Sequence, residues 1–225
     1  MISRAGLGRT ARTVWALLWA LLLMAGAEVG RIALGSNLHT VVPGRCYRAA
    51  QPSPRDLHQY AQSLGIRSIV NLRGYDEHAW YAAERMTAES LGIRFVDAGL
   101  WASAQPTAQE FIEIVRGVDE SAEPILVHCE SGIDRSGLAA AIFLLLKTDA
   151  SLEQARRQLG LRYGHFASGR AGCQDRILDA YADWLLERGL AHRPEEFRRW
   201  ARGSYQPEVR QAAGGATTSC RARTR

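Results

Sequence analysis

A cysteine and an arginine six positions apart, Cys129 and Arg135, are the residues of this chain best suited to chemistry. They lie in the segment PILVHCESGIDRSGLAAAIFLLL, residues 124–146, which predicts a strand, a short loop and a buried helix. Such a loop turns its backbone N–H groups toward one point, and the positive N-terminus of the helix adds to their field. The segment therefore predicts an anion site. Its phosphate-binding residues would be Glu130, Ser131, Gly132, Ile133, Asp134 and Arg135.

The same loop predicts that Cys129 is a nucleophile. A positive field stabilises the thiolate, which is the reactive form of cysteine. Arg135 has the planar fork that binds two phosphate oxygens at once, and Gly132 permits a backbone conformation that larger residues resist. Ser136 can donate a hydrogen bond to the thiolate and so assist its departure. The alternative is an inert buried cysteine in an ordinary strand–loop–helix, which would need neither the arginine nor the hydroxyl.

The loop resembles a known catalytic signature. Residues 128–137, HCESGIDRSG, match the H-C-x5-R-[ST] pattern of cysteine-dependent phosphatases. The stretches YRAAQPSP at 47–54 and NLR at 71–73 resemble the bacterial dual-specificity-like phosphatases, which are related to the atypical enzymes of plants and fungi. The resemblance spans roughly residues 38–190. It implies that Cys129 attacks phosphorus, that water hydrolyses the resulting phosphocysteine, and that no metal or other cofactor takes part.

Other cysteine-loop proteins differ in spacing or in order along the chain. Rhodanese-like sulfurtransferases usually have a loop that is one residue shorter. Low-molecular-weight phosphatases and arsenate reductases carry the loop near the start of the domain, whereas several predicted elements precede it here. Two alternatives stay open: a pseudophosphatase that binds phosphate without hydrolysis, and a phosphatase for lipid or inositol phosphates rather than for proteins.

The general acid has two candidates. The family usually supplies an aspartate from a loop upstream, and Asp97 lies 32 residues before Cys129. However, Asp97 is at the end of a predicted strand, and the loop that follows, LWASAQP, contains no acidic residue. Asp134 is the rival, inside the signature loop and next to Arg135. Either carboxyl group could protonate the leaving oxygen, or it could simply cap a strand or pair with an arginine.

Four other residues have weaker cases. We expect His128 to orient the loop through hydrogen bonds. Arg73 could contact phosphate or pair with a carboxylate, and the same choice applies to Arg170. Cys173 could protect an oxidised Cys129 by forming a disulfide with it.

The elements around the loop predict an α/β fold. Strands are expected at Cys46–Ala49, Ile66–Leu72, Ile93–Ala98 and Pro124–His128, and they alternate with helical segments. This alternation predicts a mostly parallel central sheet of about four to five strands, flanked by helices. The expected helices are Pro54–Leu64, Asp76–Leu91, Thr107–Glu120, Arg135–Lys147, Leu152–Leu161, Gln174–Arg188 and Glu195–Arg202.

The N-terminal region predicts contact with a membrane. Three arginines in residues 1–12 precede an apolar run, Val14–Ala27. The run fits a single-pass anchor at about Thr13–Leu34, a signal peptide cleaved after the A-G-A at 25–27, or a soluble core helix. Because the basic flank stays inside, the anchor would place the body on the outer face of the cytoplasmic membrane. Cleavage would instead give a secreted or periplasmic protein.

Composition and charge exclude several function classes. The net charge is +5, but residues 1–12 carry +3 and residues 189–225 carry +5, so the body carries −3. This body is unlike a nucleic-acid-binding domain, and the four scattered cysteines contain no CxxC pair for a zinc site. We expect the segments 1–35 (basic segment with anchor or signal), 36–206 (phosphatase domain) and 207–225 (disordered basic tail). The expected partner is a phosphorylated protein, lipid or small molecule.

Overall fold

The computed structural model describes residues 12–24, 26, 30, 35–102, 104–167 and 172–207 of the chain. The chain divides into two compact units, Met1–Gly35 and Ser36–Arg225. In the first unit, residues 12–24 form a helix whose side chains are all exposed. Within the described ranges, no helix has both the length and the apolar character that a membrane crossing needs. The predicted span Thr13–Leu34 thus gains no support, and eight of its residues (25, 27–29 and 31–34) lie outside those ranges. Of the predicted tail, the residues from 208 onward also lie outside them.

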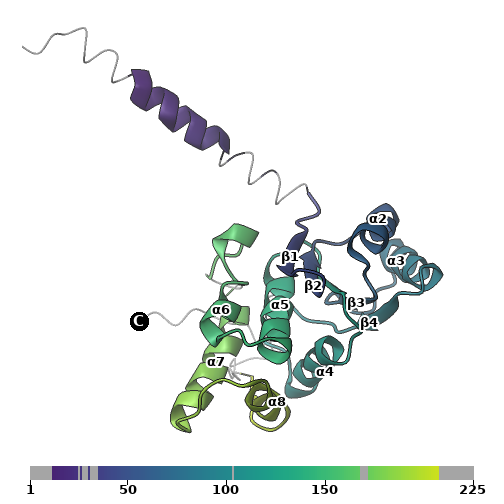
Figure 1. Ribbon diagram of the computed structural model, residues 1–225, viewed down its shortest axis with the longest axis vertical. Coiled ribbons are helices and arrows are strands. Elements are labelled where there is room, and N and C mark those ends of the chain that lie inside the picture. Colours follow the sequence, from purple (N-terminus) through teal and green to yellow (C-terminus); the bar gives the residue numbers. More distant parts are fainter. Residues whose placement is uncertain are drawn as a thin grey trace, which may run out of the picture. The chain divides into compact units, whose positions relative to one another are not determined.

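A five-stranded sheet forms the centre of the second unit (Figure 1). Its strands are β1 (His39–Val42), β2 (Cys46–Ala49), β3 (Ser68–Asn71), β4 (Arg94–Asp97) and β5 (Ile125–His128), in the order β1-β2-β5-β3-β4. Strand β1 pairs antiparallel with β2, and the other three neighbouring pairs are parallel. The predicted, mostly parallel α/β sheet is therefore confirmed. Strand β1 was not among the predicted strands, because none of its four residues is buried (three are half-buried and Thr40 is exposed) and they give a weak pattern.

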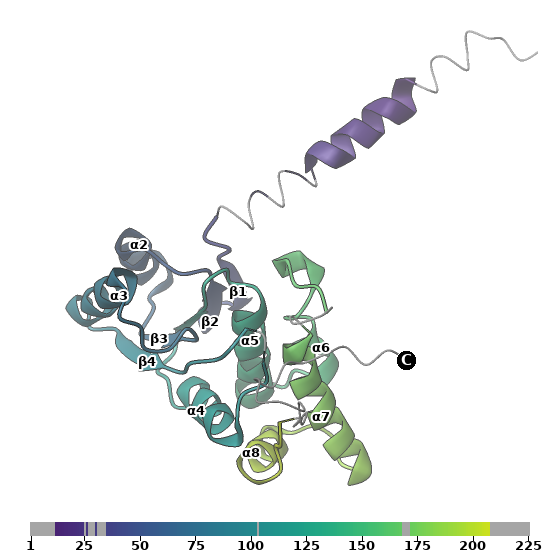
Figure 2. The same ribbon diagram turned by 180° about the vertical axis from the view of Figure 1, so that it is seen from behind.

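Helices cover both faces of the sheet (Figure 2). On one face α2 (Pro54–Leu64) and α3 (Ala79–Ser90) bury Leu57, Tyr60 and Ala88. On the other face, α4 (Ala108–Asp119), α5 (Asp134–Lys147), α7 (Cys173–Glu187) and α8 (Pro194–Gly203) enclose the larger core. Short α6 (Leu152–Arg156) and the 3₁₀ helix η1 (Leu161–Tyr163) connect α5 to α7.

Local side-chain chemistry sets where several helices begin. Helices α2 and α4 start with capping boxes, in which Ser53 pairs with Asp56 and Thr107 pairs with Glu110. Both starts were predicted from the sequence. The helix predicted from Asp76 begins only at Ala79, because a carboxylate oxygen of Asp76 accepts the backbone N–H of His78 at 2.8 Å and holds a turn there.

The helix predicted at Leu152–Leu161 ends early, at Arg156. Its next carbonyl groups are used elsewhere in the fold, since the carbonyl oxygen of Gln158 accepts a hydrogen bond from Arg48 of β2 at 2.5 Å. Sequence periodicity contains no information on such a partner, which lies 110 residues away.

Helix α5 is buried on nearly all sides, as its apolar composition predicts. Its side chains from Ser136 to Phe143, and Leu145 and Leu146, are buried between the sheet and the outer helices. Strand β5 lies between β2 and β3, so the loop from β5 to α5 emerges at the middle of the edge where the parallel strands end. Ligand sites of open α/β sheets lie at this edge.

Candidate active site

The loop between β5 and α5 is held from behind by two polar side chains. Arg48 donates from Nη2 to the carbonyl oxygens of Gly132 at 3.0 Å and of Ile133 at 2.6 Å. Asn37 donates from Nδ2 to the carbonyl oxygens of Ser131 at 3.1 Å and of Gly132 at 3.2 Å. In a planar trans peptide the C=O and the following N–H point in opposite directions. Because these three carbonyls face Arg48 and Asn37, the N–H groups of residues 132–134 face the opposite side, as an anion-binding nest requires.

Arg48 is a fully buried cation under this loop. Its guanidinium group lies over the Tyr163 ring, 4.0 Å from the ring centroid. Burial lowers the pKa of Arg48 to about 10, so the group stays protonated at neutral pH. The sequence analysis missed this residue as a site residue, although it lies in the YRAAQPSP stretch that supported the family resemblance.

Gly132 allows the loop to lie against the end of β2. Its φ is +72°, which favours glycine, and an added Cβ atom would lie 2.6 Å from the backbone nitrogen of Ala50 and 2.7 Å from the carbonyl carbon of Ala49. No side chain fits in this space. The glycine is thus required by contact as well as by conformation.

The structure brings Cys129 and Ser136 together at the floor of the loop. The sulfur of Cys129 lies 3.2 Å from the hydroxyl oxygen of Ser136, and both residues are buried. Arg135 follows on the first turn of α5; its Nη1 donates to the carbonyl oxygen of Leu100 at 3.4 Å, and its Nη2 lies 3.7 Å from a carboxylate oxygen of Glu130. These positions suit a thiol nucleophile beneath a bound phosphate.

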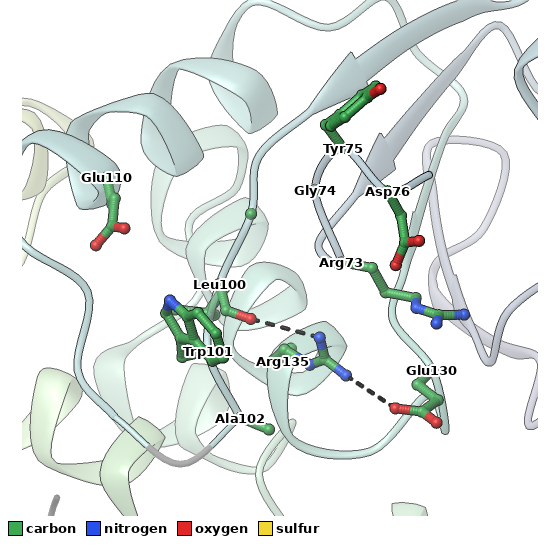
Figure 3. Close-up of a pocket in the computed structure, with 11 residues that line it drawn as sticks. Arg73, Gly74, Tyr75, Asp76, Leu100, Trp101, Ala102, Glu110, Glu130 and Arg135 are labelled. Carbon is green, nitrogen blue, oxygen red and sulfur yellow. Dashed lines mark hydrogen bonds and ion pairs between the residues drawn. The ribbon is translucent and has the colours of Figure 1, made fainter. Parts of the chain in front are cut away.

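A pocket of about 610 Å³ opens above this loop (Figure 3). Its walls are the loops that follow β3 and β4 together with Glu110 of α4, and Glu130 of the nucleophile loop and Arg135 of α5 reach it. The pocket contains two arginines, Arg73 and Arg135, and three carboxylates. Those carboxylates belong to Asp76, Glu110 and Glu130.

Asp97 is held away from this pocket. Its two carboxylate oxygens accept hydrogen bonds from Asn71 Nδ2 at 2.9 Å and from the Tyr81 hydroxyl at 2.6 Å. It lines a separate groove of about 210 Å³ between β4 and α4, with Arg94 and Arg116 among its neighbours. Asp97 lies at the end of strand β4, as the sequence predicted, and its carboxylate is hydrogen-bonded to Asn71 and Tyr81.

Asp134 is paired with a buried histidine. Its Oδ1 lies 2.6 Å from Nδ1 of His165, and Nε2 of that ring lies 2.8 Å from Oδ2 of Asp175. Burial opposes protonation of His165, but the two carboxylates outweigh it and raise the pKa of His165 to about 9. The ring is therefore an imidazolium ion at neutral pH, and it ties the start of α5 to α7.

The other predicted residues are placed as follows. Arg73 lines the pocket and stacks on Trp80, with 3.6 Å from its guanidinium carbon to the ring centroid. His128 contacts the carboxylate of Glu84, at 2.7 Å from Nε2 to Oε1. Cys173 takes part in a disulfide while Cys129 is a free thiol, so these two are not bonded to each other. Arg170 lies outside the described residues.

No metal centre is found in the described part of the chain, where no three His, Cys, Asp or Glu side chains are grouped as ligands. The residues that the sequence analysis missed are Asn37, Arg48, Glu84, His165 and the pocket acids Asp76 and Glu110. Each of these residues lies near the loop or the pocket only because the chain folds and brings distant segments together.

Comparison with known proteins agrees with this geometry. Residues 28–150 match the model of a family described as the tyrosine phosphatase family. A comparison with curated proteins gave no significant match.

Two solved structures with TM-scores of 0.50 or more share this fold. The core catalytic domain of the PP-IP phosphatase SIW14 from S. cerevisiae is 22% identical, with a TM-score of 0.51 over 68% of this chain and 89% of that one. PTPMT1 is 15% identical, with a TM-score of 0.50 over 68% and 98% of the two chains. TpbA from P. aeruginosa is 21% identical, with a TM-score of 0.47 over 64% and 83%. The family match covers more than half of the sequence, and the chain therefore belongs to the tyrosine phosphatase family.

Proposed function

We propose that this phosphatase hydrolyses phosphomonoesters through a phosphocysteine on Cys129. The observation that carries the proposal is a buried thiol at the base of a loop whose carbonyl groups at residues 131–133 are hydrogen-bonded to Arg48 and Asn37. The thiolate attacks phosphorus, and the bond between phosphorus and the ester oxygen breaks as that oxygen takes a proton. Water then attacks phosphorus, the sulfur–phosphorus bond breaks, and inorganic phosphate leaves. The Ser136 hydroxyl stabilises the departing thiolate, and Arg135 binds two phosphate oxygens.

The test is a Cys129→Ser variant assayed with an aryl phosphate. Turnover should fall below detection. Vanadate should still bind at the active site, because the loop and Arg135 are unchanged. Cys46→Ser is the matched control: Cys46 is also a free and buried thiol, and it lies in β2. Vanadate binding by the wild type with no turnover at any pH would instead show a pseudophosphatase.

Asp76 is the proton donor that the pocket favours. It is the one aspartate among the pocket residues: its carboxylate is hydrogen-bonded to His78 but lines the pocket, whereas Asp97 and Asp134 are hydrogen-bonded and do not line it. Hydrogen bonds from His78 lower the pKa of Asp76, so catalysis through its acid form should become slower as pH rises from the acidic range.

A leaving-group series separates the three aspartates. Asp76→Asn should slow hydrolysis of an alkyl phosphate far more than that of a nitrophenyl phosphate, because only the poor leaving group needs the proton. Asp97→Asn and Asp134→Asn, which were the sequence-based candidates, serve as the comparison variants. If Asp97→Asn or Asp134→Asn shows this dependence on the leaving group and Asp76→Asn does not, that other aspartate is the proton donor.

The favoured substrate is an aryl phosphate of the phosphotyrosine type in a protein. Tyr75 and Trp101 at the pocket are 72% and 69% exposed, and they offer apolar surface to an aromatic leaving group. The pocket has three carboxylates and two arginines, so its charge disfavours a substrate that carries a second or third phosphate group. A phosphate-release screen should favour phosphotyrosine peptides over phosphoinositides and inositol polyphosphates; a preference for the polyphosphates would contradict this substrate class.

The helix at residues 12–24 supports a membrane location. Apolar side chains are exposed around it, including Trp15, Leu18 and Leu22, and such a surface is suited to lipid. The proposed location is the cytoplasmic membrane with the phosphatase unit on the outer face, and the alternative is release after signal cleavage. Full-length chain in carbonate-washed membranes supports the anchor, and a soluble form that begins near residue 28 contradicts it.

A further inference from the structure

A buried histidine lies at the start of α5, and the mechanism described above does not use it. His165 is 2% exposed, and carboxylates from two helices face the two nitrogens of its ring. Asp134 is the first residue of α5, and Asp175 is in the first turn of α7. An imidazolium ring donates from both nitrogens, whereas a neutral ring donates from only one. The two contacts therefore fit the charged ring, in agreement with its raised pKa.

The segment that carries His165 is fixed against the supports of the nucleophile loop. The backbone N–H of His165 donates to the carbonyl oxygen of Gly160 at 3.3 Å, across the 3₁₀ helix η1. Within η1, the Tyr163 ring stacks on the guanidinium group of Arg48, and its carbonyl oxygen accepts a hydrogen bond from Asn37 at 3.4 Å. Arg48 and Asn37 are the two side chains that hold the loop from behind. His165 thus has a defined position relative to the loop.

The charge of Asp134 lies where it affects a bound phosphate. The carbonyl group of Ile133 faces Arg48, so the backbone N–H of Asp134 is one of those that face the anion. A carboxylate free to turn toward that side would repel a phosphate dianion and would compete with it for Arg135. In the structure, Oδ1 of Asp134 instead lies 2.6 Å from Nδ1 of His165, and Asp134 does not line the pocket.

We propose that His165 is a positioning residue for the phosphate site: it holds the carboxylate of Asp134 away from the bound phosphate and balances its charge. The proposal rests on the phosphatase function proposed above, and it explains how an acidic residue is accommodated inside an anion-binding loop. Asp175 of α7 fixes the ring through its second nitrogen, at 2.8 Å. Replacement of His165 leaves Arg48 and Arg135, the two arginines of the loop, in place.

The experiment measures the dissociation constant of tungstate, a tetrahedral dianion like phosphate, by calorimetry on the intact chain at pH 7. In His165→Gln the affinity should fall about tenfold, because the released carboxylate places a like charge close to the anion. His192→Gln is the matched control. His192 is a half-buried histidine whose Nδ1 lies 2.8 Å from the Tyr181 hydroxyl of α7, and it contacts neither the loop nor Asp134. Its replacement should leave the tungstate affinity within about twofold of the wild type.

A double-mutant comparison tests whether the effect passes through Asp134. Asp134→Asn alone should bind tungstate at least as tightly as the wild type, and adding His165→Gln to it should cause no further loss. A merely structural role of His165 gives no such rescue. A loss that persists in the double variant would therefore overturn the proposal, as would wild-type affinity in His165→Gln. If His165→Gln fails to fold, Asp134→Asn decides: weaker binding than in the wild type would show that this carboxylate supports the site, and would overturn the proposal.

Because tungstate binding needs no turnover, failure of this proposal and failure of the proposed function are distinguishable. A wild-type chain that shows the predicted pattern of tungstate affinities and hydrolyses no phosphate ester would refute the function alone. Full turnover by the wild type, with unchanged tungstate affinity in His165→Gln, would refute only the role of His165. A wild-type chain that binds no tungstate would overturn the proposal.

Discussion

Replacement of Gly132 by alanine should damage the site through one defined contact. The new Cβ atom would lie 2.6 Å from the nitrogen of Ala50, and that atom belongs to the backbone, so no side-chain rotation relieves the clash. An alanine at φ +72° adds the cost of a left-handed conformation, about 1–2 kcal/mol. With the cost of overpacking included, we expect a loss of about 3 kcal/mol in the free energy of unfolding. For a chain of this size that lowers Tm by about 6–12 °C.

The matched control for this variant is Gly65→Ala. Gly65 has nearly the same φ, +66°, but its added Cβ would have no neighbour within 4 Å. It should therefore show only the conformational cost, with full activity, when both variants are compared by thermal unfolding and by kcat/KM on an aryl phosphate. Gly132→Ala should lose about 100-fold in kcat/KM, because a shift of the loop displaces the groups that bind phosphate. Equal Tm values for the two variants, with wild-type activity in both, would refute the reasoning.

Three further predictions concern the groups around the loop. Arg48→Met removes the donors that tie back the carbonyls of the loop, so vanadate binding and kcat/KM should both fall about 100-fold. Ser136→Ala should slow breakdown of the phosphocysteine and so produce a pre-steady-state burst of the leaving group that the wild type lacks. The raised pKa of His165 means that its pairs with Asp134 and Asp175 stabilise the fold fully below about pH 6.5, and that this contribution is lost as pH rises through about 9. In His165→Gln, denaturant unfolding should show a smaller decrease in stability over that pH range than in the wild type.

The sequence predicted those features that short segments encode. The strand–loop–helix around Cys129, the starts of helices α2 and α4, and the buried helix α5 all depend on neighbouring residues, and the structure has each of them. The parallel part of the sheet, β2 to β5, follows from the alternation of strands and helices in the same way, whereas β1 was not predicted.

The sequence did not predict the partners that the fold supplies. Asp97 is a plausible acid by position, yet Tyr81 of α3 and Asn71 of β3 hold both of its oxygens. The pairing of Asp134 with His165 joins residues 31 positions apart, and the contact of Arg48 with the loop spans 84 positions. Such pairings depend on how helices pack on the sheet, and periodicity and local spacing contain no information on that packing.

The most direct test of the central claim is the identity of the phosphorylated residue during turnover. The enzyme is mixed with an aryl phosphate, quenched in acid within milliseconds, digested and mapped by mass spectrometry. The account predicts one phosphoryl group on the sulfur of Cys129, present in the wild type, more abundant in Ser136→Ala and missing from Cys129→Ser. A phosphoryl group on any other residue, or steady turnover by Cys129→Ser at the wild-type rate, would contradict it.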